Sequence, residues 1–133
     1  MKTLPWIRLL FLLAALYDGF FGVVFLAVPG YLFQLFDVTP PNHMGYVQFP
    51  AALLLIFALM FLAVAGDPIR NRNLIVYGIF LKCAYCGVTF FYWFTGDIPF
   101  MWKPLAVTDL VMGVLFVLCY AVLGRAITEE PDG

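Results

Sequence analysis

The stretch LLFLLAALYDGFFGVVFLAV (residues 9–28) is twenty residues long, and Asp18 is its single charged residue. An α-helix of about twenty apolar residues spans the ~30 Å hydrocarbon core of a bilayer, so the stretch predicts a membrane-spanning helix. Asp18 lies close to the middle of that helix, where a charged side chain costs roughly 2.5–3.5 kcal/mol on insertion scales. We therefore expect Asp18 to face protein or water rather than lipid.

Three more apolar blocks of similar length follow, at Tyr46–Ala65, Leu74–Phe94 and Leu105–Leu123. The chain has 133 residues, of which 65% are hydrophobic and 11% charged, whereas a soluble domain carries about 25% charged residues. A soluble fold of this size has too little interior to bury that much apolar surface. The sequence therefore predicts an all-α polytopic membrane protein, a single bundle of four transmembrane helices at residues 9–28, 46–65, 74–94 and 105–123.

The segments between the blocks are rich in Pro, Gly, Asn and Asp, which is typical of helix ends and turns. Pro50, Pro68 and Pro104 are each expected at the start of a helix or in the turn before one. The segment YLFQLF (31–36) is expected to form a short amphipathic turn or helix in the membrane interface. The N-terminal residues resemble the start of a signal peptide. The apolar run continues past any small-residue cleavage site, however, so we expect a retained helix.

The placement of Lys and Arg predicts the orientation, since cytoplasmic loops carry an excess of these residues. One side of the membrane would carry five of them and the other side would carry Lys103 alone; the five are Lys2, Arg8, Arg70, Arg72 and Arg125. Both termini and the loop GDPIRNRN are therefore predicted to be cytoplasmic. The net charge is −1 and no basic cluster is present, so no nucleic-acid partner is expected.

Asp18 shares one face of its helix with small residues. Ala14 and Gly22 lie four residues before and after it, and small residues allow a second helix to approach closely. Asp18 therefore marks the face of the first helix that points into the protein. At 1.5 Å per residue it lies about 15 Å along its apolar block.

The third block carries a polar stripe along one helical face. Its members recur at spacings of four, three and four residues: Gly78, Lys82, Tyr85 and Thr89. Lys82 lies about 12 Å along its block, close to the depth of Asp18, so we predict that the two side chains meet if their helices are neighbours. The alternative is that Lys82 extends along its own stem to the cytoplasmic surface.

The fourth block carries Asp109, Gly113 and Tyr120 on a comparable face. Asp109 lies about one turn from the outer end of its block, where a carboxylate can reach water or the positive end of the helix dipole. An interfacial role and a functional role both stay open for this residue. The second block carries no charged residue and is expected to serve as packing or as a lipid-facing wall.

These faces together predict a small buried polar chamber between the helices. Its expected lining, and the candidate ligand-binding or proton site, is Tyr17, Asp18, Lys82, Tyr85 and Asp109. Ionisable residues inside the membrane often mark ion paths, ligand pockets or proton relays. Interhelical hydrogen bonds also simply hold small bundles together, so a site and a structural role both remain open.

The cysteines allow two interpretations. Cys83 and Cys86 form a CxxC inside the third block, and Cys119 lies in the fourth. Reactive cysteines need an exposed, electropositive setting, whereas an apolar cysteine in a membrane helix is usually a small packing residue. A redox pair is therefore the alternative to packing. Two thiols are too few ligands for a metal site, and the lone His43 is expected to be a solvated loop residue.

The glycine-bearing polar span YDGFFG and the short link DPIRNRN, in a four-span chain of this length, resemble the DoxX-like group of small bacterial membrane proteins. The resemblance implies a multi-pass protein of the bacterial inner (cytoplasmic) membrane. Some members of that group are associated with quinone-linked oxidoreductase complexes, which makes a quinone a possible cofactor here. No family active site matches residue by residue, so no catalytic residue is assigned.

The sequence contains no nucleotide fingerprint, no nucleophile beside a base and no zinc spacing. We therefore expect a non-enzymatic accessory subunit or assembly factor of a larger membrane complex, with the bilayer, other membrane subunits or further copies of itself as partners. One alternative is a quinone- or lipid-binding redox-linked subunit, in which Tyr17, Tyr85 and Lys82 donate to a carbonyl. Another is proton or small-solute transport by an oligomer through Asp18 and Asp109.

Overall fold

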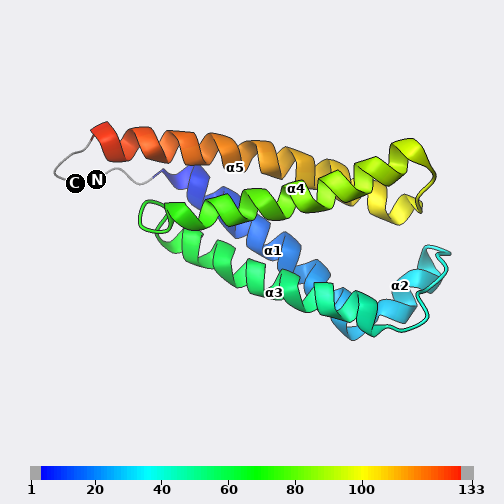
Figure 1. The fold of residues 1–133 in the computed structure, drawn as a ribbon. Coiled ribbons are helices and arrows are strands. Elements are labelled where there is room, and N and C mark those ends of the chain that lie inside the picture. The colour runs from blue at the N-terminus through cyan, green and yellow to red at the C-terminus, as the bar shows by residue number, and fades with distance from the viewer. Residues whose placement is uncertain (1–3, 130–133) are drawn as a thin grey trace.

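The computed structural model describes residues 4–129, and every regular element in that range is helical (Figure 1). The four long helices are α1 (Pro5–Ala27), α3 (Gly45–Gly66), α4 (Arg72–Thr95) and α5 (Lys103–Glu129). A short helix α2 (Pro29–Leu35) follows α1, and a 3-10 turn η1 (Phe100–Trp102) leads into α5. All four long helices are long and apolar enough to cross a membrane, which confirms the all-α fold and the four predicted spans as helices.

The helices extend beyond the apolar blocks that predict them. The first helix begins at Pro5 rather than at residue 9, and the fourth ends at Glu129 rather than at residue 123. A helix satisfies its own backbone hydrogen bonds and can continue out of an apolar environment. Hydropathy therefore locates the apolar part of a helix and not its ends. The segment YLFQLF was expected as a turn or helix, and most of it lies in α2.

One expectation about the prolines is wrong. Pro50 lies inside α3, because this helix begins at Gly45, five residues earlier. Proline has no N–H group, so the carbonyl oxygen of Tyr46 loses its usual partner in the helix. Membrane helices tolerate such positions when neighbouring structure covers them. Pro68 lies in the turn before α4 and Pro104 is the second residue of α5, as predicted.

The long helices form two pairs, because α1 packs mainly along α3 and α4 mainly along α5. Glycines allow both close approaches: a Cβ atom at Gly22 would lie 3.0 Å from the carbonyl oxygen of Ala51 on α3, and a Cβ atom at Gly113 would lie 3.3 Å from Cβ of Lys82 on α4. The prediction that the small face of the first helix admits another helix is confirmed. The helix that it admits is α3.

The two pairs converge at the end where α1 begins and α5 ends (Figure 1). The rings of Phe11, Phe61 and Phe116 contact one another there, and Phe11 lies 5.9 Å from Phe61 and 4.7 Å from Phe116 between ring centroids. Arg8 Nη1 donates to the carbonyl oxygen of Gly66 at 3.0 Å, which satisfies one of the carbonyls left free at the end of α3. We call this half of the bundle the closed end.

At the opposite end the two pairs diverge, and α2 and η1 lie there (Figure 1). We call this half the open end. A second, smaller group of buried apolar side chains holds it together: Phe25, Phe33, Ala51 and Met101. The Phe25 ring of α1 stacks on the Trp102 ring of η1 with a centroid distance of 5.7 Å. This stacking connects the two pairs where their backbones are separated.

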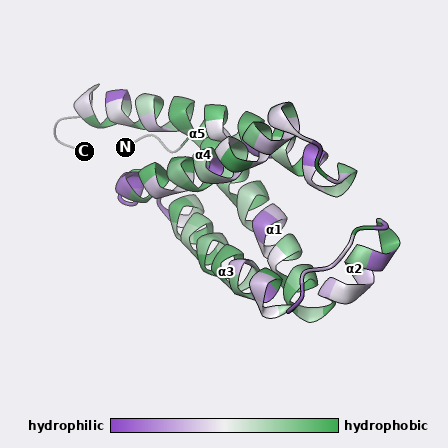
Figure 2. Cartoon of the chain, turned by 45° about the vertical axis from the view of Figure 1, so that its right-hand side comes forward, coloured by the Kyte–Doolittle hydropathy of each residue, from purple (hydrophilic) through white to green (hydrophobic). Residues whose placement is uncertain are grey.

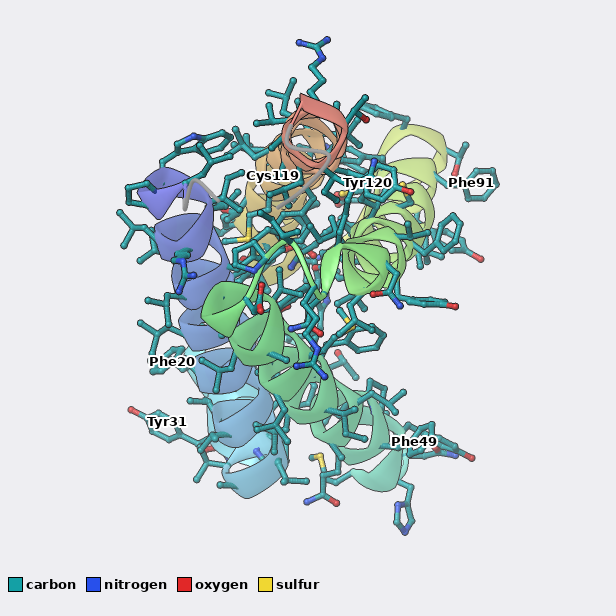
Figure 3. The ribbon with its side chains drawn as sticks, turned by 90° about the vertical axis from the view of Figure 1, so that its left-hand side faces the viewer. Phe20, Tyr31, Phe49, Phe91, Cys119 and Tyr120 are labelled. Carbon is teal, nitrogen blue, oxygen red and sulfur yellow. The ribbon has the colours of Figure 1, made fainter. Side chains whose placement is uncertain are left out.

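The outside of the bundle is apolar. Figure 2 shows hydrophobic residues along most of the four long helices, and hydrophilic residues at the turn between α3 and α4, in the loops at the opposite end and at a few positions on the helices. Large side chains such as Phe20, Phe49 and Phe91 are more than half exposed and extend away from the helices, whereas Cys119 lies between them (Figure 3). Such a surface fits contact with lipid and would be unfavourable in water.

Candidate functional site

Three buried charged side chains meet at the centre of the bundle. Lys82 Nζ donates to both carboxylate oxygens of Asp18, at 3.1 and 3.2 Å, and to Oδ1 of Asp109 at 3.1 Å. Lys82 is 1% exposed, Asp18 3% and Asp109 8%. We call these residues of α1, α4 and α5 the charged cluster. The predicted contact between Asp18 and Lys82 is confirmed, and the alternative that Lys82 reaches the cytoplasmic surface is wrong.

Small and aromatic neighbours hold the lysine in place. Gly113 leaves room on α5 for the stem of Lys82, since a Cβ atom there would crowd it. The ammonium group lies 5.5 Å from the ring centroid of Tyr17 and 5.9 Å from that of Phe61, within the range of cation–π attraction. The side chain therefore points away from α4 toward α1 and α5, where both carboxylates lie.

Asp109 lies deeper than its place in the apolar block suggests. The helix begins at Lys103, six residues earlier, so Asp109 is about 9 Å along α5. Its carboxylate contacts Lys82 and its side chain is 11% exposed. The structure therefore buries Asp109 instead of placing it at an exposed interface. Sequence spacing could not show this, because it depends on the packing of α5 against α4 and α1.

A cleft of about 470 Å³ lies between the two helix pairs and reaches the charged cluster. Sixteen residues line it, and Asp18 and Asp109 are the two charged ones: Tyr17, Asp18, Phe21, Phe25, Tyr46, Val47, Pro50, Ala51, Leu53, Leu54, Phe57, Leu81, Tyr85, Trp102, Leu105 and Asp109. The expected polar chamber is thus largely apolar. Four of its five expected residues line the cleft, and Lys82 lies buried behind them.

The α3 helix contributes seven of the sixteen lining residues. It was expected to be packing or a lipid-facing wall, and it packs against α1 as well as forming one side of the cleft. Leu53 and Tyr46 both line the cleft and are 39% and 70% exposed, so the cleft opens along α3. Apolar residues that line a cleft cannot be told from those that face lipid by sequence alone, which is why this wall was missed.

The two tyrosines of the expected chamber differ in their hydrogen bonds. The Tyr85 hydroxyl donates to the carbonyl oxygen of Trp102 at 3.2 Å. The Tyr17 hydroxyl is buried and makes no hydrogen bond to any described residue. Thr108 lies close to it; the Thr108 hydroxyl donates to the carbonyl oxygen of Pro104 at 2.9 Å, and its oxygen atom can still accept a hydrogen bond. Tyr17 therefore brings a hydroxyl group to the lining of the cleft.

The cysteines of the CxxC lie in different surroundings. Cys83 is exposed, whereas Cys86 is buried and its thiol lies 3.5 Å from the carbonyl oxygen of Ala106. A redox role for this pair stays a hypothesis, and Cys86 has a packing role against α5. Across residues 4–129, no group of three or more His, Cys, Asp or Glu side chains is placed to hold a metal ion. The ring of His43 accepts a hydrogen bond from the Gly45 amide at 2.9 Å.

Comparisons of this chain with protein-family models, with curated proteins and with solved structures find no match. The resemblance to the DoxX-like group therefore stays a prediction, and no residue role is transferred from another protein. The roles of the charged cluster and the cleft are inferred from their own geometry.

Proposed function

We propose that this protein binds a largely apolar, lipid-like small molecule in the cleft between the α1–α3 and α4–α5 pairs. The observation that supports this function is a cleft of about 470 Å³ with apolar walls and two carboxylates at its inner end. Small-molecule sites in proteins are usually about 300–1,000 Å³ in volume and mostly apolar, with a few polar groups that orient the ligand.

The position of the charged cluster favours a site over a purely structural role. A buried ion pair is weak support for stability, because removing charges from water costs nearly as much as their attraction returns. The apolar core of the closed end, with side chains such as Phe11 and Phe116, packs without a buried ion pair. Asp18 and Asp109 lie where this tight packing stops and the cleft begins. A cluster in that position can contact a bound molecule.

The opening of the cleft supports a ligand that arrives from the membrane. Leu53 lies eight residues after the start of α3, about 12 Å along the helix, and it is both exposed and part of the lining. The stacked rings of Phe25 and Trp102 line the cleft between α1 and η1. An apolar molecule can therefore enter sideways, past α3, from the hydrocarbon layer.

A change that fills the cleft tests this function. Leu54 lines the cleft from α3, so Leu54→Trp should occupy the space of the ligand. Leu59 is on the same helix, is 67% exposed and does not line the cleft, which makes Leu59→Trp the matched control. Native mass spectrometry of protein extracted in mild detergent should show a bound small molecule in the wild type and in Leu59→Trp. The signal should be absent in Leu54→Trp.

A wild-type spectrum without a bound molecule, or a bound molecule that survives Leu54→Trp, would contradict the proposal. The same spectrum addresses the accessory-subunit hypothesis, which stays a prediction: the extra mass would then be that of another polypeptide. We also infer that the closed end faces the cytoplasm, since Arg8, Arg70 and Arg72 lie there and Lys103 lies at the other end.

A further inference from the structure

The charged cluster carries an excess of one negative charge when all its groups are ionised. It contains the carboxylates of Asp18 and Asp109 and one ammonium group, that of Lys82. The other described cations lie elsewhere. Arg8 and Arg72 donate to backbone carbonyls at the closed end, Lys103 lies 3.9 Å from Asp97 at the open end, and Arg70 and Arg125 are exposed.

The remaining titratable groups around the cluster do not supply a positive charge. They are tyrosines and cysteines of α1 and α4, namely Tyr17, Tyr85 and Cys86, and α3 adds Tyr46 at the edge of the cleft. Each of these groups is neutral when protonated and negative when it has lost its proton. An uncompensated charge in an apolar interior is strongly unfavourable. The excess charge must therefore be balanced by a bound proton or by a cation that enters through the cleft.

Asp109 is the member of the charged cluster that can bind the balancing proton or cation. Its Oδ1 atom accepts a hydrogen bond from Lys82, and no hydrogen bond within residues 4–129 reaches its Oδ2 atom. Its side chain is more exposed than that of Asp18, at 11% against 4%, and it lines the cleft. Asp18 uses both of its oxygen atoms to accept from Lys82.

We propose that the cleft binds lipophilic cations and that each bound cation replaces one proton of the charged cluster. This inference rests on the proposed ligand-binding function and specifies the class of ligand: an amine or quaternary ammonium group on a largely apolar body. In the empty cleft the Asp109 carboxyl holds the proton. When the cation binds, the O–H bond breaks, the proton leaves to solvent, and the carboxylate pairs with the positive group of the ligand, so that charge is conserved.

The hydrogen bonds of the cluster favour a cation over a carbonyl ligand such as a quinone. A lysine ammonium group has three N–H donors, and three carboxylate oxygens already accept from Lys82. The donors expected for a quinone carbonyl are Lys82, Tyr85 and Tyr17. Tyr85 donates to Trp102, so Tyr17 is the one of them that makes no hydrogen bond by distance and angle within the described residues. Aromatic rings near the cluster suit a cation, since cation–π attraction operates within about 6 Å.

A pair of probes with the same alkyl chain tests the inference. Decyltrimethylammonium carries a permanent charge and cannot titrate, and decanol is its neutral counterpart. Binding to the protein in lipid nanodiscs is measured by calorimetry in buffers of different ionisation enthalpy, with empty nanodiscs as the blank. We expect saturable binding of the ammonium probe with release of one proton per cation, and affinity that falls as the pH is lowered.

Variants assign the proton to its carboxyl group. Asp109→Asn should abolish the proton release and lower the affinity for the ammonium probe by about tenfold or more. The affinity for decanol should stay unchanged. Asp97→Asn, at an exposed carboxylate outside the cleft, is the matched control and should behave as the wild type. If Asp109→Asn does not fold, the wild-type proton count still decides the outcome.

The possible results separate this inference from the function on which it rests. Equal affinity for decanol and the ammonium probe, or cation binding without proton release, would overturn the exchange of cation for proton and leave a neutral lipid-like ligand. Saturable binding of neither probe would contradict the ligand-binding function itself.

Discussion

The closed end and the open end of the bundle are built from the same four apolar helices but differ in how the space between them is filled. At the closed end the rings of Phe11, Phe61 and Phe116 contact one another and all three are fully buried. At the open end the helix pairs diverge and a cleft of about 470 Å³ remains. Tight packing therefore supports the fold in one half, and the other half contains the cleft in which we propose that a ligand binds.

The two ends also differ in the contacts that connect their helices. At the closed end Arg72 Nε donates to the carbonyl oxygen of Tyr120 at 2.9 Å, and its guanidinium group lies 3.6 Å from the centroid of the Tyr120 ring. At the open end Trp102 makes the connection, through stacking on Phe25 and a hydrogen bond from Tyr85. Regions with few packed contacts open more readily than cores, so the comparison predicts that the open end moves when a ligand enters.

The largest expected effect is at the closed end. Phe11→Ala removes a fully buried ring and should lower the free energy of unfolding by about 3–5 kcal/mol. Phe25→Ala at the open end should cost clearly less, because the cleft already borders this ring. Thermal unfolding of both variants in the same detergent measures the difference. Equal losses of stability would show that the two ends are packed alike.

The charged cluster, at the border between the two ends, should give the next largest effect. Lys82→Met leaves Asp18 and Asp109 without their shared cation, and breaking a buried ion pair costs about 3 kcal/mol or more. The carboxyl groups of this variant should bind protons, so its stability should fall as the pH rises. The double variant Lys82→Met/Asp18→Asn removes one carboxylate and should recover part of the loss. No recovery would contradict the charge count.

The smallest expected effect concerns the polar contacts of the closed end. Arg72→Met removes the hydrogen bond to Tyr120 and the cation–π contact, which should lower the free energy of unfolding by about 1–2 kcal/mol. Binding at the cleft should not change, since Arg72 does not line it. If Arg72→Met lost as much ligand binding as Leu54→Trp, the packing of the closed end and binding at the cleft would not be independent.

The sequence by itself determined the parts that depend on the chain's own pattern. Hydropathy located the four long helices, and the depth of Asp18 and Lys82 along their blocks predicted that the two side chains meet. The four-residue spacing of Ala14, Asp18 and Gly22 identified the inward face of the first helix, which packs on α3. These predictions succeed because helical rise and periodicity are the same for every α-helix.

Only the tertiary structure decided which helices became neighbours. The pairing of α1 with α3 and of α4 with α5, the burial of Asp109 against Lys82, and the cleft wall on α3 all follow from side-chain packing between distant segments. An apolar residue such as Leu54 has the same sequence signal whether it faces lipid or a cleft. Hydropathy measures transfer out of water and carries no information about which apolar surface a side chain contacts.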